Sequence, residues 1–245
     1  MPPQILRLEA CRCVLSDGAR RFTLEARNMT VAAGERVAIV GPSGIGKSTL
    51  LEMLCLLRAP DQGVQFEFDD GETMLDLLRA WQRHDERMLN GLRSRRLGYA
   101  PQRGGYFPAL SVDMNALLRG DLAGQERSRT RKMTDMLARD LSLTSRERSA
   151  RPDRLSAGER QRGVLLQAMV HSPALVIADE PTAALHPTQA EAVLRVMAGR
   201  CAAVGAALII STHDIELARQ LGFRLIVARS TASPGMVETT FDGRT

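Results

Sequence analysis

The fold of this chain is decided by the stretch Gly41-Pro42-Ser43-Gly44-Ile45-Gly46-Lys47-Ser48-Thr49. It contains the pattern G-x-x-x-x-G-K-[ST], follows an apolar run over 37–40 and opens a helix that the composition predicts over 48–57. A strand, a glycine-rich loop and a helix in this order are typical of a phosphate site beside a buried parallel sheet. We therefore predict that residues 41–49 bind nucleotide phosphates.

The residue types of this loop suit phosphate chemistry. Glycines let successive backbone N–H groups converge on phosphate oxygens, the helix N-terminus adds partial positive charge, and the Ser48 hydroxyl is a ligand for Mg²⁺. Lys47 is the most informative member, because a compact ammonium reaches between two phosphates where a planar guanidinium fits poorly. Of the 33 basic residues only Lys47 and Lys132 are lysines. Lysine therefore stands in this loop although arginine supplies nearly all the positive charge elsewhere.

Length and composition are those of a globular chain. The 245 residues are 44% hydrophobic and 25% charged, which excludes disordered and fibrous classes. The longest apolar run, 201–210, is about half of what a helix needs to cross a bilayer. The N-terminus lacks the basic and apolar pattern of a secretory signal. We expect a cytoplasmic chain that does not span the membrane.

Charge and cysteine content exclude further classes of protein. The net charge of +5 is accompanied by only 4% aromatic residues, so few side chains are available to stack on bases and we expect no nucleic-acid partner. The cysteines at 11, 13, 55 and 201 form no CxxC unit. We interpret them as buried thiols rather than disulfides or zinc ligands.

Periodicity predicts an α/β fold around the loop. Apolar and polar residues alternate over 5–10 and again over 22–26, which predicts an antiparallel hairpin or small sheet with a turn at 16–18. The remaining expectations are a polar helical region over 92–152, a buried strand over 174–178, a helix over 188–201, a strand over 206–210, and short strands with a weakly ordered end over 222–245.

Four further segments place reactive side chains at the ends of predicted elements. They are Tyr99-Ala100-Pro101-Gln102, Leu155-Ser156-Ala157-Gly158-Glu159-Arg160-Gln161-Arg162, Val176-Ile177-Ala178-Asp179-Glu180-Pro181 and Ser211-Thr212-His213-Asp214. A carboxylate at a strand end beside a phosphate loop suits Mg²⁺, and its neighbour suits orienting or deprotonating water. Alone, such an aspartate caps turns and such a histidine is usually structural, so only their combination indicates a site.

In this order and spacing, the segments resemble the ATP-binding cassette subunits of ABC transporters, from about Leu8 to Leu225. The resemblance implies a P-loop NTPase core with an N-terminal antiparallel β subdomain and an inserted helical subdomain. It assigns Walker A to 41–49, the Q-loop glutamine to Gln102, the signature sequence to 155–159, Walker B to 174–179, the catalytic glutamate to Glu180 and the switch histidine to His213.

The resemblance also implies an ATPase mechanism with ATP and Mg²⁺ as cofactors. Residues 41–49 would bind the nucleotide, Ser48, Gln102 and Asp179 would hold the metal, and Glu180, His213 and Gln102 would act in catalysis. The signature residues Leu155, Ser156, Ala157, Gly158 and Glu159 would contact the nucleotide of the opposite subunit. Two ATP molecules would then lie between head-to-tail cassettes, either a homodimer or a paired cassette.

The implied organisation is a single domain over 1–245, with a core over 1–102 and 155–245 and a helical subdomain over 103–154. That subdomain would dock onto a separate integral-membrane permease, which makes the chain peripheral at the cytoplasmic face of the bacterial inner membrane. The stretch 98–112 and the sequence Asp-Glu-Pro-Thr-Ala-Ala are similar to the lipoprotein-release and macrolide-export branch. The alternative is a mechanical or signalling ATPase that acts on a membrane partner without transport.

Two departures from the family pattern bear on function. The family carries an aromatic residue that stacks on adenine, whereas this chain has Val14-Leu15-Ser16-Asp17 near that position and Phe22 somewhat later. We therefore expect aliphatic packing of adenine. The loop after Walker B ends in His186 where the family has aspartate, and we expect slower or pH-sensitive hydrolysis because imidazole titrates near neutrality.

Overall fold

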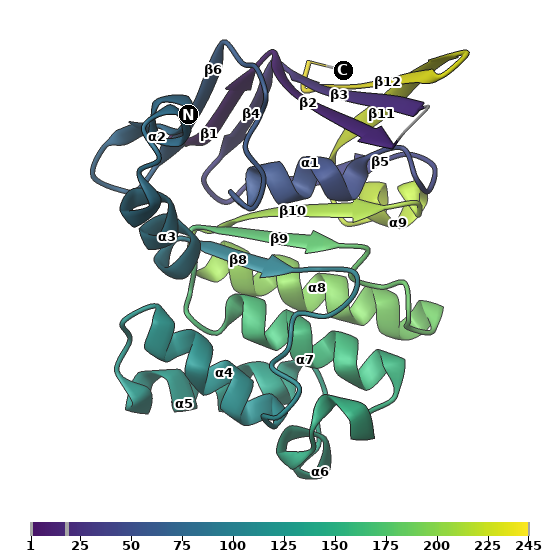
Figure 1. The fold of residues 1–245 in the computed structure, drawn as a ribbon. Helices are drawn as coiled ribbons and strands as arrows, with labels where there is room; N and C mark the ends of the chain where they lie inside the picture. Colours follow the sequence, from purple (N-terminus) through teal and green to yellow (C-terminus); the bar gives the residue numbers. More distant parts are fainter. Residues whose placement is uncertain (1, 18–19, 245) are drawn as a thin grey trace.

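A computed structural model describes residues 2–17 and 20–244, and it has the α/β architecture that the sequence predicts (Figure 1). The strands are β1 Gln4–Glu9, β2 Cys11–Asp17, β3 Arg20–Arg27, β4 Met29–Ala32, β5 Arg36–Val40, β6 Gln65–Asp69, β7 Met74–Asp76, β8 Leu97–Ala100, β9 Leu175–Asp179, β10 Ala207–Thr212, β11 Arg224–Ser233 and β12 Met236–Asp242. The helices are α1 Lys47–Leu54, α2 Leu77–Gln82, α3 Glu86–Arg95, α4 Val112–Leu122, α5 Arg127–Asp140, α6 Ser145–Ser149, the short 3₁₀ turn Pro152–Arg154, α7 Ala157–Met169, α8 Pro187–Ala203 and α9 Ile215–Gln220.

The larger sheet of the described residues has the order β2-β3-β12-β11-β5-β10-β9-β8. Its part from β11 to β8 is parallel, and β5 is buried on both faces. Val37 and Ile39 belong to the core on one face, while Ala38 and Val40 belong to the core on the other. This two-sided burial explains why the predicted strand over 37–40 is continuously apolar.

A smaller antiparallel sheet, in the order β4-β1-β6-β7, covers α1. Leu50 and Met53 of α1 are fully buried in the same core as Leu6 of β1 and Ile177 of β9. The helix after the phosphate loop therefore lies between the two sheets, and its first turn is held at the carboxyl end of β5.

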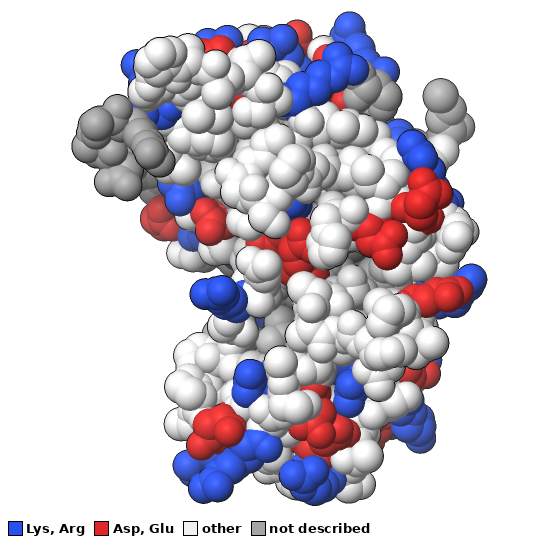
Figure 2. Space-filling model, turned by 90° about the vertical axis from the view of Figure 1, so that its right-hand side faces the viewer, with Lys and Arg blue, Asp and Glu red and all other residues white. Residues whose placement is uncertain are grey.

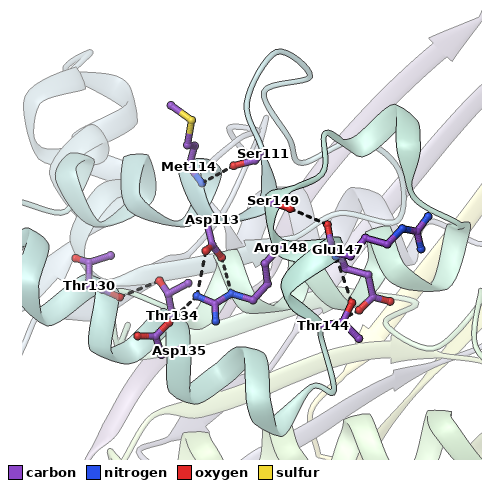
Figure 3. Close-up of polar contacts among 11 residues, drawn as sticks. Ser111, Asp113, Met114, Thr130, Thr134, Asp135, Thr144, Glu147, Arg148 and Ser149 are labelled. Carbon is purple, nitrogen blue, oxygen red and sulfur yellow. Dashed lines mark hydrogen bonds and ion pairs between the residues drawn. The ribbon is translucent and has the colours of Figure 1, made fainter.

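Helices α4, α5, α7 and α8 lie on the opposite side of the larger sheet (Figure 1). Two of them are joined by α6, because Arg148 pairs with Asp113 of α4 at 2.9 Å and with Asp135 of α5 at 2.5 Å (Figure 3). Basic and acidic side chains are interspersed over the face shown in Figure 2, including the lower part that these helices form.

The N-terminal prediction is confirmed in part. β2 and β3 form an antiparallel pair, with Cys11 opposite Ala26 and Leu15 opposite Phe22. The strands over 4–32 nevertheless belong to two sheets rather than one, because β1 and β4 pair with each other in the smaller sheet. The predicted turn at 16–18 includes Gly18, which lies outside the described residues.

Three other expectations about elements are confirmed only in part. Strands do form over 222–245, but β11 and β12 are 10 and 7 residues long rather than short, and β12 pairs in parallel with β3 over its whole length. The polar helical region does not run unbroken from 92, because β8 forms the edge of the larger sheet at 97–100. Helix α1 ends at Leu54, three residues earlier than predicted, and Leu56 follows with a φ of 59°.

The interpretation of the cysteines is confirmed. All four are free and buried. Burial raises the pKa of Cys11 to about 12 and that of Cys13 to about 11, so these thiols are not reactive nucleophiles. In the part of the chain that the structure describes, no helix combines the length and hydropathy needed to cross a bilayer.

Candidate active site

The phosphate loop connects β5 to α1 with two glycines in the left-handed region. Gly44 has a φ of 77° and Gly46, the N-cap of α1, has a φ of 99°. No side chain caps α1 and no acidic residue lies in its first turn. Its first N–H groups are therefore available to an anion, and the helix dipole favours negative charge there.

Phe22 of β3 packs directly against this loop. A Cβ atom at Gly46 would lie 2.6 Å from the Cζ atom of the Phe22 ring, in addition to the strain of its positive φ. Phe22 lies late in the sequence for a contact with nucleotide. In the structure β3 pairs with β12 in the larger sheet, and the Phe22 ring lies against Gly46 of the loop.

Lys47 turns its ammonium back toward the loop. Its Nζ donates to the carbonyl oxygen of Gly41 at 2.7 Å and to that of Pro42 at 3.0 Å. The same atom lies 3.5 Å from Oε1 of Glu180, and the Lys47 side chain is only 6% exposed. The structure thus brings together two predicted site residues that are 133 positions apart (180 − 47).

Glu180 follows the last residue of β9 and has a φ of 48°. A non-glycine residue in this region carries about 1 kcal/mol of strain, which the surroundings must offset. Its Oε2 lies 3.1 Å from Nδ1 of His213, at the end of β10. The carboxylate therefore lies between Lys47 and His213.

Asp179 is 4% exposed at the end of β9, where the parallel register sets it opposite Ser211 of β10. The Ser211 hydroxyl donates to Oδ1 of Asp179 at 2.5 Å and accepts from the backbone N–H of Glu180 at 2.9 Å. The sequence pattern alone assigns no role to Ser211. Two parallel strands that end side by side are the feature that predicts its position near Asp179.

The predicted metal ligands suit a hard divalent cation. Ser48, Gln102 and Asp179 offer a hydroxyl, an amide carbonyl and a carboxylate, and oxygen donors of this kind are those that Mg²⁺ prefers. Gln102 and Asp179 both line a groove of about 530 Å³, which the first turns of α7 also border. The donor set therefore fits Mg²⁺ held together with phosphate oxygens.

The signature segment begins α7. Ser156 is the N-cap and forms a capping box with Glu159, in which each side chain accepts from the backbone N–H of the other residue. These hydrogen bonds with Ser156 lower the pKa of Glu159. Leu155 is buried, and Ala157 is exposed. Among the described residues, no hydrogen bond or ion pair joins 155–159 to the phosphate loop of the same chain.

His186, the departure in the loop after β9, is the N-cap residue of α8. Its side chain makes no capping hydrogen bond, and its Nδ1 lies 3.1 Å from Oγ1 of Thr188. The side chain is exposed, so it is accessible to a second subunit. Its effect on hydrolysis stays a prediction, as do the residue roles and domain bounds taken from the resemblance.

The chain matches the family model described as ABC transporter over residues 24–183. It is 34% identical over 224 residues to the lipoprotein-releasing system ATP-binding protein LolD of Idiomarina loihiensis, an alignment that covers 90% of this chain and 93% of that protein. It is 35% identical to the Fe(3+) ions import ATP-binding protein FbpC of Pseudomonas fluorescens, over 82% of this chain and 53% of that protein.

Solved structures agree with these relatives. The dimeric structure of MJ0796, a bacterial ABC transporter cassette, superposes with a TM-score of 0.76 at 25% identity and covers 95% of this chain and 96% of that one. A post-hydrolysis dimer of MJ0796 bound to ADP and Pi matches equally well. The predicted fold and family are thus confirmed: this chain belongs to the ABC transporter family, as an ATP-binding cassette of the LolD type that hydrolyses ATP.

Proposed function

We propose that this cassette drives a separate membrane-spanning permease by binding and hydrolysing two Mg-ATP molecules in a head-to-tail dimer. The observation that carries the catalytic part is the convergence of Lys47, Glu180 and His213 from α1 and the ends of β9 and β10. A cation, a carboxylate and an imidazole at one end of a parallel sheet are what phosphoryl transfer to water requires.

Each residue has a role that its position supports. Residues 41–49 surround the phosphates with N–H groups, and Lys47 neutralises charge on them. Glu180 accepts a proton from the attacking water, or orients that water, while His213 contacts the terminal phosphate. The contact between Glu180 and His213 fixes the position of each side chain relative to the other for this step.

Ser48, Asp179 and Gln102 would hold Mg²⁺, which supplies neutralisation of phosphate charge when bound. The Ser211 hydroxyl donates to one oxygen of Asp179 and so orients the carboxylate. Gln102 follows β8 and lies on the groove between the core and the helices, so its position depends on both.

The signature residues would complete the site of a second copy. Ser156, Ala157 and Gly158 stand at the N-terminus of α7, a helix of 13 residues whose dipole favours an anion. No hydrogen bond or ion pair of the described residues joins them to the phosphate loop of the same chain, which supports a contact across a dimer. The MJ0796 cassette, to which this chain is similar, is dimeric, which supports assembly as a dimer.

The partner is proposed from the relatives. LolD proteins of Idiomarina loihiensis and Maricaulis maris are named as parts of lipoprotein-releasing systems. We assign this chain to the same branch, docked through its helical subdomain (103–154) onto an integral-membrane permease at the cytoplasmic face of the inner membrane. The substrate would then be a lipid-anchored protein.

The test is recovery of the tagged chain from membranes of its own host. We expect it to sediment with membranes, to leave them in a carbonate wash, and to copurify in detergent with a protein that has membrane-spanning helices. Transport is tested by reconstituting that complex in vesicles that carry a lipid-anchored protein. Recovery only from the high-speed supernatant, with no membrane protein attached, would refute the proposal.

A further inference from the structure

Gln161 of α7 forms two hydrogen bonds with the segment that follows β9. Its Nε2 donates to the carbonyl oxygen of Glu180 at 2.7 Å, and its Oε1 accepts from the backbone N–H of Ala184 at 3.0 Å. A backbone carbonyl only accepts and a backbone N–H only donates, so these partners fix the orientation of the side-chain amide. Gln161 is therefore hydrogen-bonded to both ends of the turn from Glu180 to Ala184.

The backbone of Glu180 is held on both sides. Its N–H donates to the Ser211 hydroxyl at 2.9 Å, and its carbonyl accepts from Gln161 and, at 3.1 Å, from the N–H of Ala183. A positive φ at a non-glycine residue persists only where neighbouring groups hold it. The direction in which the Glu180 carboxylate leaves the backbone therefore depends on these contacts.

We propose that Gln161 is a positioning residue for ATP hydrolysis, because it fixes the backbone of Glu180 so that the carboxylate stays between Lys47 and His213. The inference rests on the proposed role of Glu180. No hydrogen bond among the described residues joins Gln161 to Lys47 or to His213. Gln161 thus acts through Glu180 and not on the nucleotide.

The signature turn packs against the same loop. A Cβ atom at Gly158 would lie 3.2 Å from the carbonyl oxygen of Ala184 and 3.2 Å from Cδ2 of Leu185. The start of α7 and the loop after β9 are therefore in van der Waals contact, three residues from Gln161. A movement of the signature segment at the start of α7 would therefore also displace the loop to which Gln161 is hydrogen-bonded.

The next residue ties α7 to the other helices. Arg162 pairs with Glu147 of α6 at 3.2 Å, and these side chains are 12% and 8% exposed. Glu147 is followed by Arg148, which Figure 3 shows between Asp113 and Asp135. These ion pairs connect α4, α5, α6 and α7. Gln161 of α7 therefore links this group of helices to the backbone of Glu180, the proposed catalytic glutamate.

The experiment compares two substitutions of Gln161 with one control in the full-length chain. Gln161→Met keeps the length of the side chain and removes both hydrogen bonds. Gln161→Glu, ionised, keeps an acceptor for the N–H of Ala184 but cannot donate to the carbonyl of Glu180. The control is Gln167→Met, on the same helix, whose Oε1 is buried and makes no hydrogen bond.

We expect kcat per nucleotide-binding site to fall about tenfold in Gln161→Met, because the hydrogen bond to the Glu180 carbonyl, which positions the carboxylate, is among the two that are lost. The Kd for ATP stays unchanged, and the ATP-bound dimer persists longer. Gln161→Glu loses as much activity, and Gln167→Met matches the unsubstituted chain. Counting turnover per bound nucleotide removes the effect of unfolded protein from kcat.

Full activity of Gln161→Glu would overturn the inference, because the donor to Glu180 would then be dispensable. A loss in Gln161→Met no larger than in Gln167→Met would overturn it as well. Glu180→Gln is measured in parallel. Slow turnover of Glu180→Gln with normal Gln161 variants refutes this inference alone, whereas full turnover of Glu180→Gln refutes the proposed role of Glu180 itself.

Discussion

The ammonium of Lys47 lies 3.5 Å from the Glu180 carboxylate, and the two side chains are only 6% and 10% exposed. Charges this well buried attract each other strongly. In the proposed mechanism, phosphate oxygens that draw Lys47 toward them would therefore release one oxygen of Glu180. We expect the same two residues to act first in ATP binding and then in hydrolysis.

Lys47→Arg conserves charge and is nonetheless expected to lower ATP turnover about 100-fold or more. The ammonium occupies a buried space between two carbonyl oxygens and a carboxylate, where a planar guanidinium does not fit. Steady-state phosphate release measures the loss. The control is Lys132→Arg, at the chain's other lysine, which is exposed on α5 and is expected to be nearly silent. Equal rates for the two variants would contradict this assignment.

Glu180→Gln is expected to keep ATP binding and to lower turnover by about 100-fold to 10,000-fold, because an amide cannot take a proton from water. The ATP-bound dimer should accumulate, since hydrolysis no longer reopens it. Size-exclusion chromatography with ATP detects the dimer, and equilibrium binding of a nucleotide analogue checks affinity. Undiminished turnover would show that another group acts on the water.

His186→Asp is expected to stabilise the fold and to change hydrolysis. An aspartate N-cap accepts from the free N–H groups of α8 and should add about 1 kcal/mol to the free energy of unfolding, measured in urea. The hydrolysis rate should rise and lose part of its dependence on pH. His186→Ala removes the imidazole without adding a cap. If His186→Asp left both the rate and the pH profile unchanged, the proposed influence of His186 would be lost.

Phe22→Ala is expected to weaken ATP binding about tenfold, because the ring supports the loop at Gly46. The Kd for ATP and for GTP, measured by calorimetry, should rise together if the ring only supports the loop. A larger loss for ATP would reveal contact with adenine as well. Phe22→Leu restores much of the volume and should bind ATP better than Phe22→Ala. An unchanged Kd for ATP in Phe22→Ala would contradict the proposal that the Phe22 ring supports the phosphate loop.

His171 is expected to make stability depend on pH. Burial, and next the charge of Arg119, lower its pKa from 6.5 to about 3. Below about pH 6.5 the unfolded chain binds a proton that the folded chain does not, so the free energy of unfolding falls with falling pH. This residue contributes at most about 1.4 kcal/mol per pH unit until the folded chain also binds the proton near pH 3.

The measurement is urea unfolding at several values between pH 7 and pH 5. His171→Gln should show a shallower loss of stability over this range than the unsubstituted chain. The control is His84→Gln, because His84 is exposed and precedes α3. Parallel curves for the unsubstituted chain and His171→Gln would show that the imidazole is protonated in the folded state.

The order of strand, phosphate loop and helix was predictable because its chemistry is local: glycines, a lysine and a periodic helix lie within twenty residues. A shared site for Glu180 and His213 was expected from a resemblance, and the adjacent parallel strands β9 and β10 bring the two residues together. The bonds of Gln161 were not predictable, because its partners are backbone atoms with no signature in the sequence. The pairing of β12 with β3 was not predictable for a related reason, since the two strands lie near opposite ends of the chain.

The pairing of β3 with β12 affects how the chain folds during its synthesis on the ribosome. Met236 of β12 lies opposite Arg21 of β3, 215 residues earlier (236 − 21), and β12 alone connects the pair β2 and β3 to the rest of the larger sheet. A nascent chain therefore carries this hairpin with an open edge until β12 leaves the ribosome. Open edges pair readily with other chains, and such distant contacts form slowly. Translation that stops short of residue 236 would leave that edge permanently exposed to aggregation.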